Sequence, residues 1–361
     1  MNDDPRNILI YLPNWVGDVV MATPALRALR RRFAGARFTC VGRQVSIDTL
    51  EGLGWFDASV VDPSWPRATA ANFFRLARRL RQGRFDAAIL MPNSFRTALA
   101  VRLARVPRRI GYARDGRGWL LSDRLEPRRD EAGAFVPLSA IDYYLDLARH
   151  LGAEVADRRM ELAATAADDA AADAMLKEAG SRADKPLVML NPGASFGVSK
   201  MWNADRYGLV ADALIERFGA QIIINAAPNE KNVAADVAAA MKHAPLINFA
   251  DRDNTIGALK ALMRRCRVLI TNDTGARHFA AAMGIGVVTL FGSTDPRWAE
   301  LNYSRERILR ADVPCSPCQR KLCPQPAGPR YHQCMMAIAP DSVIDAAGEL
   351  LSQPMPSGAS A

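Results

Sequence analysis

The sequence predicts an α/β protein built from two Rossmann-like domains that face each other across a cleft. First, short apolar runs rich in β-branched residues alternate with longer amphipathic stretches, which is typical of a parallel sheet covered by helices on both faces. Second, this alternation stops in an Ala- and Asp-rich stretch near residues 163–185 and then restarts. Third, 361 residues suffice for two domains of ordinary size. We expect one domain at residues 1–170, another at 171–351, and a disordered tail at 352–361.

The chain is basic, with 47 Lys and Arg against 38 Asp and Glu and a net charge of +9. Such an excess suits nucleic acid, an anionic membrane surface or a polyanionic substrate. Aromatic residues are only 7% of the chain and are not interleaved with the basic clusters, which argues against nucleic-acid binding by base stacking. No apolar run approaches the roughly 20 residues of a membrane span, and the N-terminus lacks a signal-peptide pattern. We therefore expect a cytoplasmic protein that binds no nucleic acid.

The first strand and the loop after it provide the first candidate for catalysis. Residues 8–12 form an apolar run, the loop 13–18 follows, and a helix is expected from about 19 to 33 with Pro24 near its first turn. Loops of this kind lie at the carboxyl edge of the sheet, so Asp18 is expected to point into the crevice there. Alternatively, Asp18 caps the helix, since Asp is a favoured N-cap residue.

The remainder of the first half continues the pattern. Strands are expected at 38–41, 58–61 and 87–91, and helices at 69–82, 94–106 and 137–151. Arg96 lies at the mouth of a strand-to-helix turn and is a candidate for contacting an anionic substrate. The Arg clusters at 27–32 and 75–81 are typical of solvated helix faces. Residues 115–133 lack clear periodicity and are predicted to be a loop.

The second half begins with a strand at 187–190 and a loop at 191–202 that suits a phosphate. The loop combines Gly and small residues with hydroxyl donors and a cation, and it is not a Walker loop because the Gly-Lys-Ser/Thr run is missing. The candidate phosphate-binding residues are Gly193, Ala194, Ser195, Ser199 and Lys200.

Glu230 follows the next strand, at 221–226. In dinucleotide sites, an acidic residue beyond a later strand commonly binds a ribose hydroxyl. Glu230 is therefore a candidate ribose ligand, and a capping or surface role is the alternative. Another strand at 246–249 and a helix at 256–265 lead into the last unit.

Residues 268–291 are predicted to form a strand, a polar turn, a helix and a second strand. Gly275 leaves room for an anion to approach the turn, and His278 lies in the first helical turn. The free N–H groups and positive dipole end of the helix would face the crevice, so a diphosphate is the natural ligand. The alternative is an ordinary structural crossover.

Four cysteines fall in one Pro-rich loop at 314–334. In a cytosolic protein, such spacing indicates a metal site more often than disulfide bonds. Structural zinc is one interpretation. Reduced, packed thiols are the other. The proposed zinc ligands are Cys315, Cys318, Cys323 and Cys334.

Together these motifs resemble glycosyltransferase family nine, the ADP-heptose:lipopolysaccharide heptosyltransferases. Trp15 and the Cys-rich loop are similar to the heptosyltransferase II branch, which adds the second heptose of the inner core. The resemblance spans nearly the whole chain, and it is carried by Gly17-Asp18 with Thr23-Pro24, Asn191-Pro192-Gly193-Ala194, Ser199-Lys200-Met201-Trp202, Asn272-Asp273-Thr274-Gly275 with His278, and Phe291-Gly292-Ser293-Thr294-Asp295-Pro296.

The resemblance implies a GT-B fold, an ADP-L-glycero-D-manno-heptose donor, inversion at the anomeric carbon and no catalytic metal. It implies that Asp18 is the catalytic base and that Lys200 neutralises the leaving diphosphate. It places Glu230 near the donor ribose, and it adds Asp273, Thr274, Gly275 and His278 to the donor-binding residues.

Asn14, Trp15 and Arg96 are expected to bind the acceptor. That acceptor would be a lipid A–core molecule at the inner-membrane surface, where the enzyme would associate peripherally. The alternatives are a GT-B enzyme that uses another nucleotide sugar and a basic two-domain nucleic-acid-binding protein.

Overall fold

The computed structural model describes residues 4–63 and 69–354, and the chain divides into two compact units. One unit comprises Met1–Glu161 and Arg297–Glu300, and the other comprises Leu162–Pro296 and Leu301–Ala361. The division falls earlier than the predicted boundary at 170. Helix α7 (Ala166–Glu178) belongs to the second unit because it packs on α10 (Ile256–Arg265), where Asp169 pairs with Arg265 at 3.0 Å.

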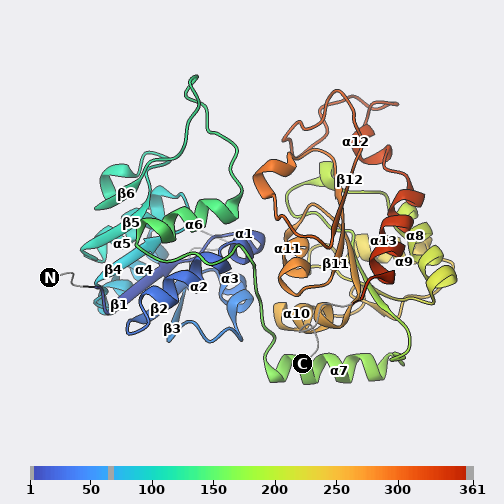
Figure 1. Cartoon of the computed structure of the whole chain (residues 1–361), viewed down its shortest axis with the longest axis horizontal. Coiled ribbons are helices and arrows are strands. Elements are labelled where there is room, and N and C mark those ends of the chain that lie inside the picture. Colours follow the sequence, from blue (N-terminus) through green and yellow to red (C-terminus); the bar gives the residue numbers. More distant parts are fainter. Residues whose placement is uncertain (1–3, 64–68, 355–361) are drawn as a thin grey trace. The chain divides into compact units, whose positions relative to one another are not determined.

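The first unit contains a six-stranded parallel sheet with the order β3-β2-β1-β4-β5-β6, which is the Rossmann order (Figure 1). Met91 N–H donates to the Tyr11 carbonyl, so the chain leaves β1 and β4 side by side. These two strands flank the topological switch point, where α/β sheets bind ligands. The strands are β1 (Asn7–Tyr11), β2 (Arg37–Gly42), β3 (Ala58–Val61), β4 (Ala87–Leu90), β5 (Arg108–Tyr112) and β6 (Asp123–Leu125).

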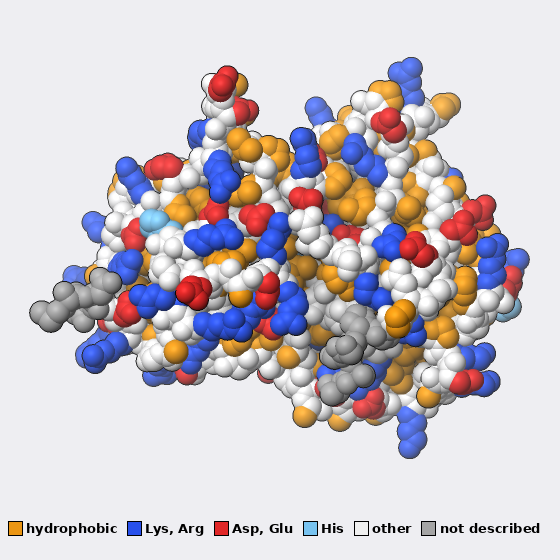
Figure 2. Space-filling view, viewed as in Figure 1, with side chains coloured by type: hydrophobic (Ala, Val, Ile, Leu, Met, Phe, Trp, Pro, Cys, Tyr) orange, Lys and Arg blue, Asp and Glu red, His pale blue; other side chains and the backbone are white. Residues whose placement is uncertain are grey.

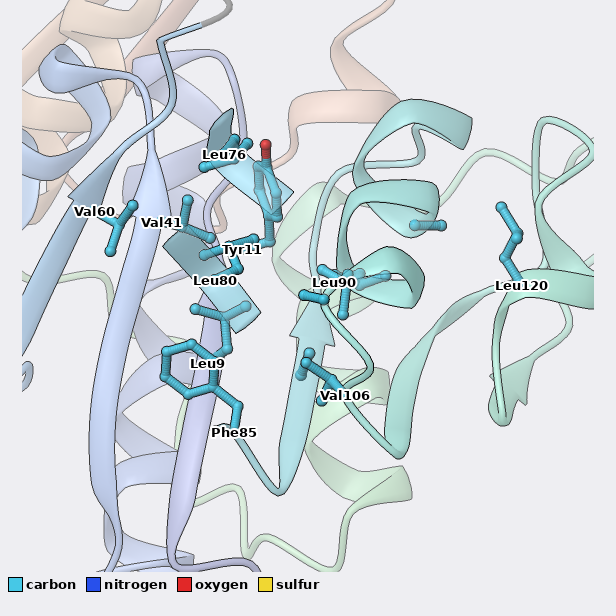
Figure 3. Packing of buried hydrophobic residues seen from close by; sticks show 14 of the residues in the cluster. Leu9, Tyr11, Val41, Val60, Leu76, Leu80, Phe85, Leu90, Val106 and Leu120 are labelled. Atoms are coloured by element: carbon cyan, nitrogen blue, oxygen red, sulfur yellow. The ribbon is translucent and has the colours of Figure 1, made fainter. Parts of the chain in front are cut away.

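Helices cover this sheet, and a cluster of buried apolar side chains fills the space between them (Figure 3). Leu9 from β1 and Leu90 from β4 pack with Leu76 and Leu80 from α4. Burying one such side chain contributes about 1.5–3 kcal/mol, so this layer fixes the strands that carry the loops of the switch point. The helices are α1 (Val16–Met21), α2 (Thr23–Arg32), α3 (Gln44–Leu50), α4 (Ala70–Gln82), α5 (Phe95–Leu103) and α6 (Ala140–His150).

Two expectations for the first unit are wrong. The single helix predicted at 19–33 is two helices, α1 and α2, because Pro24 lies at the start of α2, where its missing N–H is tolerated, and the Thr23 hydroxyl donates to the Val20 carbonyl. The loop predicted at 115–133 contains a 3₁₀ turn at Gly118–Leu120 and strand β6, which pairs with β5. The sequence of β6 lacks the apolar alternation that would have indicated a strand.

The second unit repeats the architecture. Its six-stranded parallel sheet has the order β12-β11-β10-β7-β8-β9, which is again the Rossmann order when numbered from β7. The switch point therefore lies between β7 and β10. The strands are β7 (Leu187–Asn191), β8 (Gln221–Ile224), β9 (Ile247–Asn248), β10 (Val268–Asn272), β11 (Gly286–Phe291) and β12 (Glu306–Arg310).

Strand β7 precedes the predicted phosphate loop, and strand β10 is the first strand of the predicted βαβ unit. Both strands are buried throughout. The remaining helices are α8 (Ala204–Phe218), α9 (Lys231–Ala240), α11 (Gly275–Ala282), α12 (Gln333–Met336) and α13 (Pro340–Ser352). The predicted tail begins inside α13, and its last residues, 355–361, lie outside the described ranges. Across 4–63 and 69–354, no helix combines the length and apolar character needed to cross a membrane.

Candidate active site

In the second unit, the structure brings together Lys200 and Asp273, two residues that the sequence assigns to the donor site. The Lys200 ammonium donates to the Asp273 carboxylate at 2.6 Å and to its main-chain carbonyl at 2.9 Å, and only about a tenth of either side chain is exposed. Thr294 also donates to the Asp273 carboxylate, at 2.7 Å. Burial alone would raise the pKa of Asp273, but the Lys200 charge and these donors lower it. These contacts hold the Lys200 side chain in one position at the switch point.

The start of α11 offers main-chain donors beside this pair. The N-cap residue, Thr274, makes no side-chain cap, because its hydroxyl interacts with Asn191 and Thr271 instead. The N–H groups of Gly275 and Ala276 donate to none of the residues that the structure describes. Free N–H groups at the positive end of a helix bind anions, as the sequence predicts for this turn.

His278 is buried in α11, where burial and then the neighbouring Arg277 charge lower its pKa to about 3. The imidazole is therefore neutral at physiological pH, and its Nδ1 atom is buried with no hydrogen-bond partner among the described residues. Arg277 is itself fully buried and pairs with Glu306 of β12 at 2.5 Å. His278 thus lies next to the donor-side residues as an uncharged group.

The Glu230 side chain packs against the phosphate loop instead of capping its own helix, α9. A Cβ atom at Gly193 would collide with the Glu230 carboxylate, so the Glu230 side chain could not keep this position if a larger residue replaced the glycine. Burial raises the pKa of Glu230, whereas contacts with the Ala194 N–H and the Ser195 side chain oppose the shift. Glu230 lies at the N-cap of α9 but makes no side-chain cap. Its predicted ribose contact stays a prediction, and its contacts within the protein brace the loop.

A buried chain of amides along the same edge was not predicted. Asn254 donates to Asn225 at 2.5 Å, Asn225 donates to Asn191 at 2.6 Å, and Asn191 donates to Thr271 and Thr274. The chain links the ends of β7, β8 and β10. An Asn at the end of each of two apolar runs, at 191 and 225, was the signal in the sequence that could have indicated it.

The Cys-rich loop contacts the phosphate loop directly. Ser199, assigned to donor binding, is buried, and its hydroxyl donates to the Arg320 carbonyl at 2.5 Å while its N–H donates to the Lys321 carbonyl at 3.1 Å. The Gln319 N–H donates to the Ser293 carbonyl at 2.7 Å. Ser199 therefore joins two loops, and the Cys-rich loop supports the segment that presents Lys200.

The four cysteines of this loop are free thiols. Burial and then the nearby thiols of Cys315, Cys318 and Cys323 raise the pKa of Cys334. Within the described part of the chain, no three His, Cys, Asp or Glu side chains are arranged to hold a metal ion. Zinc therefore stays a prediction, which a measurement of the metal content of the purified protein would check.

In the first unit, Asp18 lies in the first turn of α1. The N-cap of α1 is Trp15, and no side chain caps the helix, so Asp18 does not play the alternative role of N-cap. The carboxyl group is half-buried, and burial raises its pKa to about 6. Helix α6 packs on α1, and the Asp18 charge adds to burial in raising the pKa of Tyr144. Asp18 is thus a desolvated carboxylate that is ready to accept a proton near neutral pH.

The predicted acceptor residues lie at the same edge of the first sheet. Asn14 and Trp15 are exposed, with 57% of Trp15 accessible to solvent. Arg96, in the first turn of α5, donates to the buried Asp62 at 2.6 Å, and the Tyr11 hydroxyl donates to the same carboxylate oxygen. Arg96 is therefore an oriented cation whose charge Asp62 partly balances.

The Arg cluster on α2 is only partly the solvated face that the sequence suggests, since Arg31 is exposed but other members are paired with carboxylates. Arg27 is buried and pairs with Asp157 at 2.5 Å and Glu161 at 2.7 Å, and Arg32 pairs with Asp4 at 2.7 Å. Figure 2 shows Lys and Arg interspersed with Asp and Glu over the visible face. The carboxylates that neutralise α2 come from distant parts of the chain, and local sequence does not reveal them.

Comparisons with known proteins find relatives that match nearly the whole chain. The chain is 26% identical over 354 residues to the lipopolysaccharide heptosyltransferase 2 of Salmonella typhimurium, which covers 96% of this chain and 99% of that protein. Among solved structures, a glycosyl transferase family 9 protein from Veillonella parvula matches with a TM-score of 0.80 at 22% identity, covering 97% of this chain and 98% of that one. The E. coli ADP-heptose lps heptosyltransferase II matches with a TM-score of 0.75 at 23% identity, covering 96% and 98%.

Two Rossmann-type units, each with polar loops at its switch point, match the GT-B fold of these solved structures. The chain belongs to glycosyltransferase family 9, the heptosyltransferase family, whose model matches residues 73–327. The predicted family, fold and enzyme class are therefore confirmed.

Proposed function

We propose that this enzyme transfers L-glycero-D-manno-heptose from ADP-heptose to the inner core of lipopolysaccharide and adds the second heptose. The family match and the relatives named heptosyltransferase 2 or II support the reaction class. The observation that carries the proposal is the buried Lys200–Asp273 pair beside the free N–H groups of α11. Together they form a site for the diphosphate of a nucleotide sugar.

The donor side would accelerate the reaction by stabilising the leaving group. As the glycosidic bond to the diphosphate breaks, negative charge grows on ADP. Lys200 and the N–H groups of Gly275 and Ala276 are fixed in place before that charge develops, so little reorganisation is needed. Neutral His278 adds no competing charge to this arrangement.

The first unit would supply the base. The acceptor hydroxyl must lose a proton as it attacks the anomeric carbon, and a positioned carboxylate can accept it. Because burial raises the pKa of Asp18 to about 6, the carboxylate is mostly ionised at neutral pH yet more basic than an exposed Asp. Attack on the face opposite the leaving ADP inverts the anomeric centre, and none of these steps requires a metal.

We assign the acceptor to Asn14, Trp15 and Arg96. An inner-core acceptor carries acidic sugars and phosphates and lies at an anionic membrane face, so a cation at this edge would orient it. Such an acceptor implies that the enzyme acts at the cytoplasmic face of the inner membrane and associates with that membrane peripherally.

Replacing Arg96 by alanine should raise the acceptor KM by about 10-fold, with a larger effect at low salt, and leave ADP affinity unchanged. The variant also removes one donor from the buried Asp62 carboxylate, which still accepts from the Tyr11 hydroxyl, so thermal stability must be measured in parallel. The double variant Arg96→Ala with Asp62→Asn removes that buried charge. If the double variant recovers the wild-type acceptor KM, Arg96 acts only through Asp62 and does not bind the acceptor.

The proposed function is tested by ADP release with a panel of donors and acceptors. We expect turnover with ADP-heptose and a truncated core that carries one heptose, and little with a core that carries none. Faster turnover on the heptose-free core would contradict the second-heptose assignment. Equal turnover with another nucleotide sugar would contradict the donor assignment.

A further inference from the structure

The Asn93 side chain, in the loop between β4 and α5, is locked in one orientation. Its Oδ1 atom accepts from the Arg117 guanidinium at 3.1 Å and from the Tyr143 hydroxyl at 3.0 Å. A guanidinium only donates, so the amide atom that faces it must be the oxygen. The amide nitrogen therefore points away from this pair, and it donates to none of the residues that the structure describes.

The groups that fix this orientation are themselves rigid. Arg117 is fully buried and also donates to the Pro92 and Tyr112 carbonyls. Tyr143 stacks on Tyr112 with ring centroids 3.8 Å apart, and the Tyr112 hydroxyl donates to the Tyr143 carbonyl. Asn93 is thus clamped between a buried cation and a stacked tyrosine.

Arg117 makes no direct ion pair with a carboxylate among the described residues, although the charge of Asp115 acts on it, so it is an unusual buried cation. Burial lowers the pKa of Arg117 to about 10, because a charge that is removed from water is destabilised. Its N–H groups donate to three oxygens, the Tyr112 and Pro92 carbonyls and Asn93 Oδ1. A charged donor on Oδ1 also polarises the amide, which makes its N–H groups better donors. This arrangement prepares the Asn93 nitrogen to donate to an acceptor atom outside the loop.

The position of Asn93 indicates what that atom belongs to. Asn93 lies just beyond β4, next to β1, whose following loop leads to Asp18. Helix α6 connects the two, because Tyr143 binds Asn93 and α6 packs on α1. The amide and the proposed base therefore share one edge of one unit.

We propose that the Asn93 amide donates a hydrogen bond to an oxygen of the acceptor saccharide, either a hydroxyl or an acidic group, and so helps to orient it toward Asp18. This inference rests on the proposed function, since it names a further acceptor-binding residue for the same reaction. Neither of the donor-side loops takes part.

The test is the Asn93→Asp variant, which has the same shape and keeps an oxygen for Arg117 and Tyr143. It replaces the NH2 donor by a second carboxylate oxygen. We expect the acceptor KM to rise about 10- to 100-fold and ADP affinity to change little, whereas the melting temperature should not fall, because the new carboxylate also pairs with the buried Arg117. An unchanged acceptor KM, or a loss confined to ADP-heptose affinity, would overturn the proposal.

Asn7→Asp provides a matched control. Asn7 starts β1 at the opposite edge of the same sheet, and its amide donates to the Gly83 and Arg84 carbonyls. This variant should lose stability and keep the wild-type acceptor KM. If it raises the acceptor KM as much as Asn93→Asp does, the effect comes from general destabilisation and the proposal fails.

Direct binding of a deacylated one-heptose core fragment, measured by calorimetry, separates this inference from the proposed function. Absence of turnover by the wild-type enzyme contradicts the proposed function. Wild-type turnover together with unweakened fragment binding by Asn93→Asp contradicts only the role of Asn93.

Discussion

Replacing Asp18 by alanine should lower turnover by about 100-fold or more while ADP binding stays close to that of the wild type, because the variant loses its general base. The plot of kcat/KM against pH provides a second readout. Asp18 works when deprotonated, and burial raises its pKa to about 6, so wild-type kcat/KM should fall as the pH drops through about 6. The residual activity of the variant should show no such fall there.

The isosteric Asp18→Asn variant controls for folding. Since burial raises the pKa of Asp18, its ionised form costs stability above pH 6, and that cost disappears below the ordinary value of 3.8. Asp18→Asn should therefore melt at a higher temperature than wild type at pH 8 and at a similar one near pH 3.5. Near wild-type turnover in either variant would remove Asp18 from the mechanism.

Replacing Lys200 by alanine should weaken ADP binding and also slow turnover by about 100-fold, because the charge on the leaving diphosphate loses its fixed counter-charge. The variant should also be unstable. Only about a tenth of the Asp273 side chain is exposed, and breaking a buried ion pair from one side typically costs about 3–5 kcal/mol.

The double variant Lys200→Met with Asp273→Asn separates stability from catalysis. It removes both charges, so it should regain most of the lost unfolding free energy and remain slow. Calorimetric melting and ADP titration would check this. Recovery of turnover together with stability would mean that Lys200 only balances Asp273 and does not act on the diphosphate.

The sequence predicted those parts of the site that depend on local pattern. The loops after β7 and β10 were found because small and polar residues follow apolar strands, and the structure joins Lys200 to Asp273 across them. The alternation of strands and helices likewise indicated the two sheets.

The parts of the fold and site that the sequence did not predict depend on contacts between distant segments. The ion pairs of Arg27 with Asp157 and Glu161 bury this member of the basic cluster on α2. The hydrogen bond from Arg117 to Asn93 is also non-local, and Arg117 lies in a stretch that has no periodicity. A sequence pattern reports which residues lie on one face of an element, but it does not report the side chain that meets them from another.

Mass analysis of the reaction product tests the central claim most directly. The purified enzyme is incubated with ADP-heptose and a truncated core that carries one heptose, and ADP release is followed together with the mass of the core. We expect one ADP released for each heptosyl residue gained by the core. Release of ADP without a gain in mass, or no reaction with this donor and acceptor, would contradict the assignment of this enzyme as a core heptosyltransferase.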